Sequence, residues 1–264
     1  MHRGKQTLKD RYGFDDLVEI IRILRSKNGC PWDKVQTHET LRDSMIEEAY
    51  EVVEAINNKD MENLCEELGD VLMQVIFHAT MEAEKGGFTL EDVYDGISKK
   101  MISRHSHIFA SDVANTPEDV VVNWEKNKKK EKGYKTQTQV LESIPKALPA
   151  LTRARKIQAK AADVGFDLEN LDEAIKKLEE EIDELKNALN SGDEGIAEEY
   201  GDVLFSCVNI SRFLGLNPEF ALTNSSEKFI NRFRYIEETA LSRGRTLENL
   251  TILDMDQLWE QSKQ

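Results

Sequence analysis

Apolar side chains recur at intervals of three and four residues along most of this chain, which is the spacing of one face of an α-helix. Residues 41–56 carry one such series and residues 64–79 carry another, and the polar segment 57–60, Asn-Asn-Lys-Asp, lies between them as a turn. Valine, isoleucine and threonine form no alternating runs, and the chain holds only five prolines. The pattern therefore predicts an all-α fold, in which two helices joined by so short a turn pack antiparallel.

The order of features in the first half of the chain recurs in the second half. Each half has a helix with paired acidic residues, a short turn, a second acidic helix, a Lys-x-x-x-Arg sequence and a tryptophan. A lysine-rich run at residues 125–135 separates the halves and has no aliphatic side chain, which is typical of a linker or a solvated helix end. We therefore predict two tandem helical repeats, residues 14–124 and 141–264, joined by a lysine-rich linker at 125–140.

The overall charge limits the choice of partners. The 264 residues include 50 acidic and 35 basic side chains, so the formal net charge is −15 and the chain repels polyanions; we expect no stable complex with nucleic acid. The three cysteines have no Cys-x-x-Cys spacing, and no apolar run is long enough to span a membrane. These features predict a cytoplasmic protein without a membrane partner. Cys207 lies in an apolar run, and we expect its thiol to be buried.

Paired acidic residues border the apolar stripe on the same side of four predicted helices. At about 100° per residue, each pair lies about 70–80° and 130–140° from the centre of its stripe. The residues of the first half are Glu48, Glu51, Glu67 and Asp70, and those of the second half are Glu181, Glu184, Glu199 and Asp202. Side chains that border the seam of an antiparallel pair converge across it, so each half brings four carboxylates together. The alternative is a solvated acidic face, which is the usual role of a single Glu-x-x-Glu.

Four carboxylates in a small volume repel each other unless a cation lies between them. Mg²⁺, with Mn²⁺ as a substitute, prefers oxygen ligands of this kind. A ferritin-like iron site would need Glu-x-x-His where this chain has Glu-x-x-Asp. Lys100 with Arg104, and Lys228 with Arg232, each lie on one helical face. These cations are either surface ion-pair partners or phosphate ligands, and beside a metal they indicate phosphate chemistry.

Several short segments together resemble one protein family. They are the pairs EEAYE with ELGD and EEIDE with EYGD, the segment NGCPWDKVQT at 28–37, RHSHIFA at 104–110 and VGFD at 164–167. In this combination the chain resembles MazG, the two-repeat, all-α family of nucleoside triphosphate pyrophosphohydrolases. The resemblance implies Mg²⁺-dependent hydrolysis of NTPs and dNTPs to the monophosphate and pyrophosphate, with water attacking the α-phosphorus. It also implies a homodimer, in which each antiparallel bundle completes a four-helix core.

The resemblance also implies roles for individual residues. The catalytic and metal-binding set would be Glu181, Glu184, Glu199 and Asp202 of the second repeat, with Lys177, Lys228, Arg232 and Trp259 binding the substrate. A second set in the first repeat would use Glu48, Glu51, Glu67 and Asp70 for metal, and Lys100, Arg104 and Trp124 for substrate. We expect the main activity in the second repeat. Two alternatives remain, a non-catalytic nucleotide-binding or dimerisation scaffold and a pyrophosphatase restricted to one nucleotide such as dUTP or dCTP.

Overall fold

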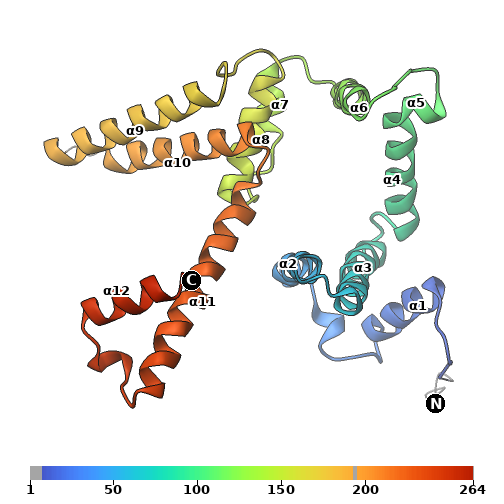
Figure 1. Cartoon of the computed structure of the whole chain (residues 1–264). Coiled ribbons are helices and arrows are strands. Elements are labelled where there is room, and N and C mark those ends of the chain that lie inside the picture. Colours follow the sequence, from blue (N-terminus) through green and yellow to red (C-terminus); the bar gives the residue numbers. More distant parts are fainter. Residues whose placement is uncertain (1–7, 193–194, 264) are drawn as a thin grey trace. The chain divides into compact units, whose positions relative to one another are not determined.

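The computed structural model describes residues 8–192 and 195–263, and these residues form helices and no β-strand (Figure 1). The all-α prediction is therefore confirmed. The chain divides into two compact units, Met1–Lys128 and Lys129–Gln264, here called unit 1 and unit 2. Within the described ranges, no helix combines the length and the hydropathy that crossing a bilayer requires.

Unit 1 is built around an antiparallel helical hairpin. Its helices in chain order are α1 (Phe14–Arg25), the 3₁₀ turn η1 (Asp33–Val35), α2 (Arg42–Asn58), α3 (Met61–Glu84), α4 (Leu90–Arg104) and α5 (Ser106–Phe109), followed by α6 (Pro117–Lys132), whose last turn belongs to unit 2. The turn between α2 and α3 is tight because Lys59 takes a left-handed conformation, with φ of 56°, and Asp60 caps α3 by accepting a hydrogen bond from the Asn63 backbone. The hairpin expected from the apolar series is therefore present.

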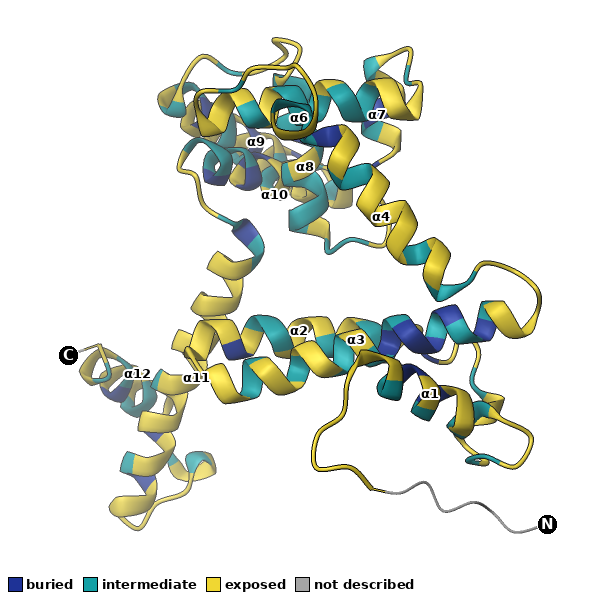
Figure 2. Ribbon diagram, turned by 90° about the vertical axis from the view of Figure 1, so that its right-hand side faces the viewer, coloured by how far each residue is buried: buried dark blue, intermediate teal, exposed yellow. Residues whose placement is uncertain are grey.

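The buried core of unit 1 lies at one end of this hairpin. It joins the C-terminal half of α3 to α1, and Figure 2 shows the buried positions of α3 concentrated where α1 packs against it. Its members are Val18, Ile21, Leu41, Ile76, Phe77 and Met81. Burying such side chains stabilises the fold by about 1.5–3 kcal/mol each. The N-terminal half of α3, which carries the acidic residues, is left half-buried or exposed.

Unit 2 repeats the hairpin and adds helices around it. It contains α7 (Gln137–Glu142), α8 (Ala150–Ala162), α9 (Leu171–Ser191), α10 (Ile196–Phe213), α11 (Pro218–Ser242), the 3₁₀ turn η2 (Leu247–Asn249) and α12 (Ile252–Gln261). The helices α9 and α10 lie side by side, α8 packs against α10, and α11 packs against α8 and α12 (Figure 1). Asn170 caps the start of α9, and Gly192, with φ of 66°, ends it in the left-handed region.

Two features of the sequence take a particular place in the fold. The lysines of residues 126–132 lie on the last turns of α6, and the boundary between the units follows Lys128. The prediction that Cys207 is buried is wrong, because its side chain is exposed. The adjacent Ser206 and Val208 are buried instead. An apolar run on a helix does not bury every member when neighbouring helices cover only one side of it.

Candidate functional site

Three acidic side chains of unit 2 meet across the α9–α10 hairpin. Glu181 and Glu184 come from α9 and Glu199 comes from α10, and one carboxylate oxygen from each lies within 4.8 Å of the others. Glu181 is 7% exposed, Glu199 is half-buried and Glu184 is exposed. The antiparallel packing places the i and i+3 positions of one helix opposite the start of the other. The predicted convergence of carboxylates is therefore found in this unit.

Electrostatic repulsion within this cluster is partly relieved by one cation. Lys177, one turn before Glu181 on α9, places its ammonium 2.9 Å from Glu181 and 3.1 Å from Glu180. The hydrogen bonds to these two carboxylates raise the pKa of Lys177, so it stays charged. Desolvation by burial raises the pKa of Glu199, and the nearby charges of acidic neighbours, led by Glu184, raise it further. The cluster thus has more negative charge than its protein surroundings neutralise.

The fourth predicted acid of this set, Asp202, does not belong to the triad of residues whose carboxylate oxygens converge. It lies one turn beyond Glu199 on α10, and its charge contributes to raising the pKa of Glu199. Asp202 also lines a cavity of about 530 Å³ together with Glu181 and Lys177. The four predicted acids therefore form a triad and one neighbour at the edge of a cavity.

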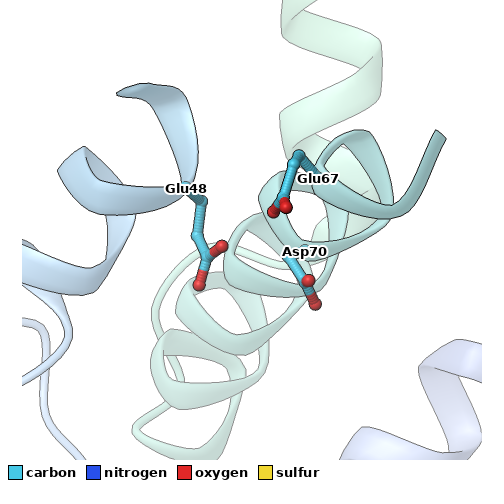
Figure 3. A group of neighbouring side chains, drawn as sticks. All are labelled: Glu48, Glu67 and Asp70. Carbon is cyan, nitrogen blue, oxygen red and sulfur yellow. The ribbon is translucent and has the colours of Figure 1, made fainter. Parts of the chain in front are cut away.

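Unit 1 contains a matching triad. Figure 3 shows Glu48 of α2 facing Glu67 and Asp70 of α3, and one oxygen from each lies within 4.8 Å of the others. Burial, then the charges of Asp70 and Glu51, raise the pKa of Glu48, while a hydrogen bond from Gln74 acts in the opposite direction. The pKa of Glu67 is raised by burial and then by Glu51 and Asp70. Glu51 is exposed and remains outside the triad but next to Glu48.

Both triads have the chemistry of a site for a hard divalent cation. Each offers three carboxylate oxygens, and such oxygens are the ligands that Mg²⁺ and Mn²⁺ prefer. Burial first, and then the charges of neighbouring carboxylates, raise the pKa values of Glu48, Glu67 and Glu199. A cation would relieve this repulsion, and the half-open surroundings leave room for the waters that Mg²⁺ retains.

The predicted phosphate ligands of unit 2 lie on other helices. Lys228 and Arg232 of α11 line a second cavity of about 600 Å³, which the acidic triad does not line. The guanidinium of Arg232 lies 5.4 Å from the ring centroid of Trp259 on α12, and the ring of Phe229 lies 5.1 Å from the same indole. Trp259 therefore joins α11 to α12. The structure groups these three predicted residues with one another but not with the triad.

Unit 1 repeats the contact between arginine and tryptophan. The guanidinium of Arg104 lies 5.1 Å from the ring centroid of Trp124, and His105 meets the same ring edge-on at 5.2 Å. Arg104 is 7% exposed, so in this structure its guanidinium is engaged inside the unit. Lys100, one turn earlier on α4, is half-buried. The arginine and the tryptophan of this recurring pattern thus meet in a cation–π contact in both units.

Sequence reasoning missed several polar residues that the folded units bring together. In unit 2, Gln158 of α8, with Asn209 and Arg212 of α10, lines the cavity that reaches Glu181 and Asp202. In unit 1, His38 lies 2.7 Å from both His78 of α3 and Glu82 of the same helix. A single glutamine or asparagine on a helix gives no signal of its own. These residues are identified only once the helices are packed.

Comparisons with known proteins agree with the duplicated architecture. The family model described as the MazG nucleotide pyrophosphohydrolase domain matches residues 36–109 and 169–236, one match in each unit. The chain is 45% identical over 250 residues to the nucleoside triphosphate pyrophosphohydrolase/pyrophosphatase MazG of Thermotoga maritima, covering 95% of each chain. It is 42% identical over 253 residues to the nucleoside triphosphate pyrophosphohydrolase of Escherichia coli K12, covering 94% of this chain and 96% of that one. It is also 46% identical over 253 residues to the uncharacterized protein YabN of Bacillus subtilis, covering 95% of this chain and 52% of YabN.

Proposed function

The chain belongs to the family of MazG nucleotide pyrophosphohydrolases, and on that premise we propose that it hydrolyses NTPs and dNTPs to the monophosphate and pyrophosphate, with unit 2 as the main catalytic unit. The observation that carries the assignment to unit 2 is the acidic triad beside Lys177 and a cavity of about 530 Å³. A pocket of this volume is in the range that holds small-molecule ligands. Carboxylates, a cation and a cavity of this size are the parts that a nucleotide phosphate site requires.

We propose that the triad of Glu181, Glu184 and Glu199, with Asp202 beside it, holds Mg²⁺, and that Mn²⁺ can replace it. When bound there, the cation supplies charge neutralisation at the phosphate oxygens and lowers the pKa of a coordinated water. The second triad, Glu48, Glu67 and Asp70 with Glu51 beside it, has the same donor chemistry. We propose it as a second metal site whose contribution to turnover is smaller.

The bond that is cleaved is taken from the activity of the family, and the groups around the cavity have the chemistry to assist it. The oxygen of a water molecule bonds to the α-phosphorus, and the bond from the α-phosphorus to the oxygen that bridges to the β-phosphorus breaks. Pyrophosphate leaves with the electron pair of that bond, and a proton of the water passes to one of the four carboxylates. Lys177 stays charged and lines the same cavity, so it stabilises negative charge on the phosphate oxygens.

We also propose that the active form is a homodimer. Tyr200 and Leu204 on α10 and Leu189 on α9 are large apolar side chains left exposed in a single copy. A helical hairpin with an uncovered apolar side is stabilised by packing against a second hairpin, and two hairpins make a four-helix core. Sedimentation of the native chain tests this proposal, and a monomer at assay concentration would contradict it.

Release of pyrophosphate tests the proposed reaction. Eight common NTPs and dNTPs with Mg²⁺ are assayed with the native chain, Glu184→Gln, Glu67→Gln and the double variant. We expect Glu184→Gln to lose most of the activity and Glu67→Gln to keep most of it. Asp183→Asn is the matched control, because Asp183 lies on the same turn of α9 but is exposed and paired with Lys186 at 2.9 Å.

The remaining outcomes decide between the alternatives. Activity that falls only in the double variant would mean that both units turn over substrate. A native chain that binds NTPs but releases no pyrophosphate would favour the nucleotide-binding scaffold. Hydrolysis of one nucleotide alone, such as dUTP or dCTP, would favour the restricted pyrophosphatase.

A further inference from the structure

The cavity of unit 2 extends away from the acidic triad along one face of α10. Its lining from this helix is Asp202, Phe205, Ser206, Asn209 and Arg212, at spacings of three and four residues. The axial rise from Asp202 to Asn209 is about 10 Å, which is comparable with the length of a nucleoside from its 5′-oxygen to the far edge of its base. A nucleotide whose phosphates lay at the acids would therefore be long enough for its base to reach Asn209.

Gln158 of α8 presents a fixed hydrogen-bond acceptor in this cavity. Its side chain is 8% exposed, and its Nε2 donates to the backbone carbonyl of Phe205 at 2.8 Å. A carbonyl oxygen only accepts hydrogen bonds, so the amide nitrogen must face it and the orientation of the amide is decided. Oε1 is then left buried, and it has no hydrogen-bond partner among the described residues. A buried acceptor in this state is unfavourable until a donor reaches it.

Asn209 presents the complementary donor. Arg212 donates to Asn209 Oδ1 from Nε at 3.2 Å and from a terminal nitrogen at 3.0 Å, and the same guanidinium is paired with Asp167. Because arginine only donates, the carbonyl oxygen of Asn209 must face it, and the remaining hydrogen-bonding group of Asn209 is its NH₂. Phe205 and Phe166 add apolar surface to the lining, and Phe166 is 82% exposed. The cavity thus combines aromatic rings with one acceptor and one donor of known orientation.

We propose that this cavity binds the nucleobase of the substrate, and that Gln158 Oε1 accepts a hydrogen bond from a base N–H while Asn209 donates to an adjacent base oxygen or nitrogen. The inference rests on the proposed function, because the triphosphate places the base in the cavity. Nucleobases carry a donor beside an acceptor on their pairing edge, and aromatic side chains stack on their faces. Gln158 and Asn209 are therefore specificity-determining residues and not catalytic ones.

Unit 1 supplies an internal comparison. Asn209 follows Asp202 by seven residues, and the residue seven positions after Asp70 is Phe77, which is 5% exposed in the core. The polar position of Asn209 in unit 2 thus corresponds to an apolar core position in unit 1. Selection of the base is therefore a property of unit 2.

Calorimetric binding of non-hydrolysable α,β-methylene triphosphates tests this inference. The full chain with Mg²⁺ is titrated with the adenine, guanine, cytosine and uracil analogues. The analogue that binds best is then compared with a counterpart whose base lacks its edge N–H donors, such as purine riboside for adenosine. We expect the native chain to bind that counterpart at least about tenfold more weakly, because Gln158 Oε1 is left unpaired. We expect Gln158→Leu to bind both equally, and Asn209→Leu to bind both more weakly, because the base acceptor that Asn209 would meet is present in both.

Gln137→Leu is the matched control. Gln137 also donates its amide to a backbone carbonyl of α8, that of Lys160, but it does not line the cavity, so the base preference should persist. Equal binding of both analogues by the folded native chain would overturn the inference, and so would an undiminished preference in Gln158→Leu or unchanged binding of both analogues in Asn209→Leu. The analogues are not hydrolysed, so this outcome is separate from the proposed reaction. Base-selective binding without pyrophosphate release from NTPs would contradict the reaction alone.

Discussion

The ammonium group of Lys177 lies 2.9 Å from a carboxylate oxygen of Glu181, one turn further along α9. Glu181 is the buried member of the acidic triad, and Lys177 also lies 3.1 Å from Glu180. The lysine therefore partly neutralises the site from within its own helix. A divalent cation at the triad would compete with it for Glu181, and the displaced ammonium would remain in the cavity, within reach of phosphate oxygens.

Lys177→Met should separate these two roles of the ammonium. Removal of a competing cation should strengthen Mn²⁺ binding, whereas removal of a phosphate partner should lower pyrophosphate release by about a hundredfold to a thousandfold. Calorimetric Mn²⁺ titration and the kcat/KM of pyrophosphate release measure the two effects. Lys176→Met is the control, because Lys176 is exposed and paired with Glu173 at 2.9 Å, and it should change neither quantity. Weaker Mn²⁺ binding in Lys177→Met would contradict the competition.

Metal addition should stabilise the chain through the triads. A cation that binds the folded state at about a hundred times its Kd adds about 2.7 kcal/mol to the free energy of unfolding. Glu184→Gln should be more stable than the native chain without metal, since one repelling charge is gone, and should gain less stability from Mg²⁺. Glu67→Gln should behave in the same way through unit 1. Thermal unfolding with Mg²⁺ and with EDTA measures both effects, and equal Mg²⁺ gains in the native chain and both variants would rule out the triads as metal sites.

The hairpins and their acids could be predicted from sequence because they depend on local periodicity. The apolar series at 41–56 and 64–79 predicts α2, α3 and the turn at Lys59, and the offset of the acids from each stripe predicts their convergence. Periodicity could not say which three of the four acids would meet. The oxygens of Glu51 and Asp202 lie outside the triads because the exact packing of two helices decides the last few ångströms.

The cavity of unit 2 depends on contacts that are distant in sequence. Gln158 meets the carbonyl of Phe205 across 47 residues, and no periodic pattern predicts which turn of α8 meets which turn of α10. Cys207 shows the opposite case: its apolar run predicted that it would be buried, but neighbouring helices cover the side of α10 that carries Ser206 and Val208 and leave Cys207 exposed. The hydrogen bond between His38 and His78 likewise joins residues 40 positions apart, so local patterns do not predict it. Local patterns define helices, and tertiary contacts define what each helix buries.

The hydrogen bond between His38 and His78 should make unit 1 sensitive to acid. Burial, and then the charge of His38, lower the pKa of His78 below its ordinary value of 6.5. The unfolded chain therefore binds more protons than the folded chain just below pH 6.5, so stability falls as the pH falls through that window. The lowered pKa of Glu82, caused mainly by its hydrogen bond with His38 and then by Lys85, acts in a separate, more acidic window.

Urea unfolding of unit 1 at pH 7 and at pH 5.5 measures the contribution of His78. We expect His78→Gln to lose less stability between these two values than the native chain does, because glutamine can hydrogen-bond to His38 but does not titrate. The quantity compared is the change in unfolding free energy between the two pH values. A lower stability of the variant at pH 7 therefore does not affect the test. If both proteins lose the same stability between pH 7 and pH 5.5, titration of His78 does not cause the sensitivity to acid.

Gly201, in the middle of α10, should be replaceable by alanine with a gain in stability. A Cβ added at this position meets nothing within 4 Å, and glycine in a helix interior is less favourable than alanine by about 0.8–1.0 kcal/mol. For a chain of this size, we expect Gly201→Ala to raise the unfolding midpoint by about 2–4 °C. Gly215→Ala is the opposite control, because Gly215 has φ of 68° and alanine there is strained. A lower midpoint for Gly201→Ala, together with a weaker dimer in sedimentation, would instead place the backbone of a second copy against this turn of α10.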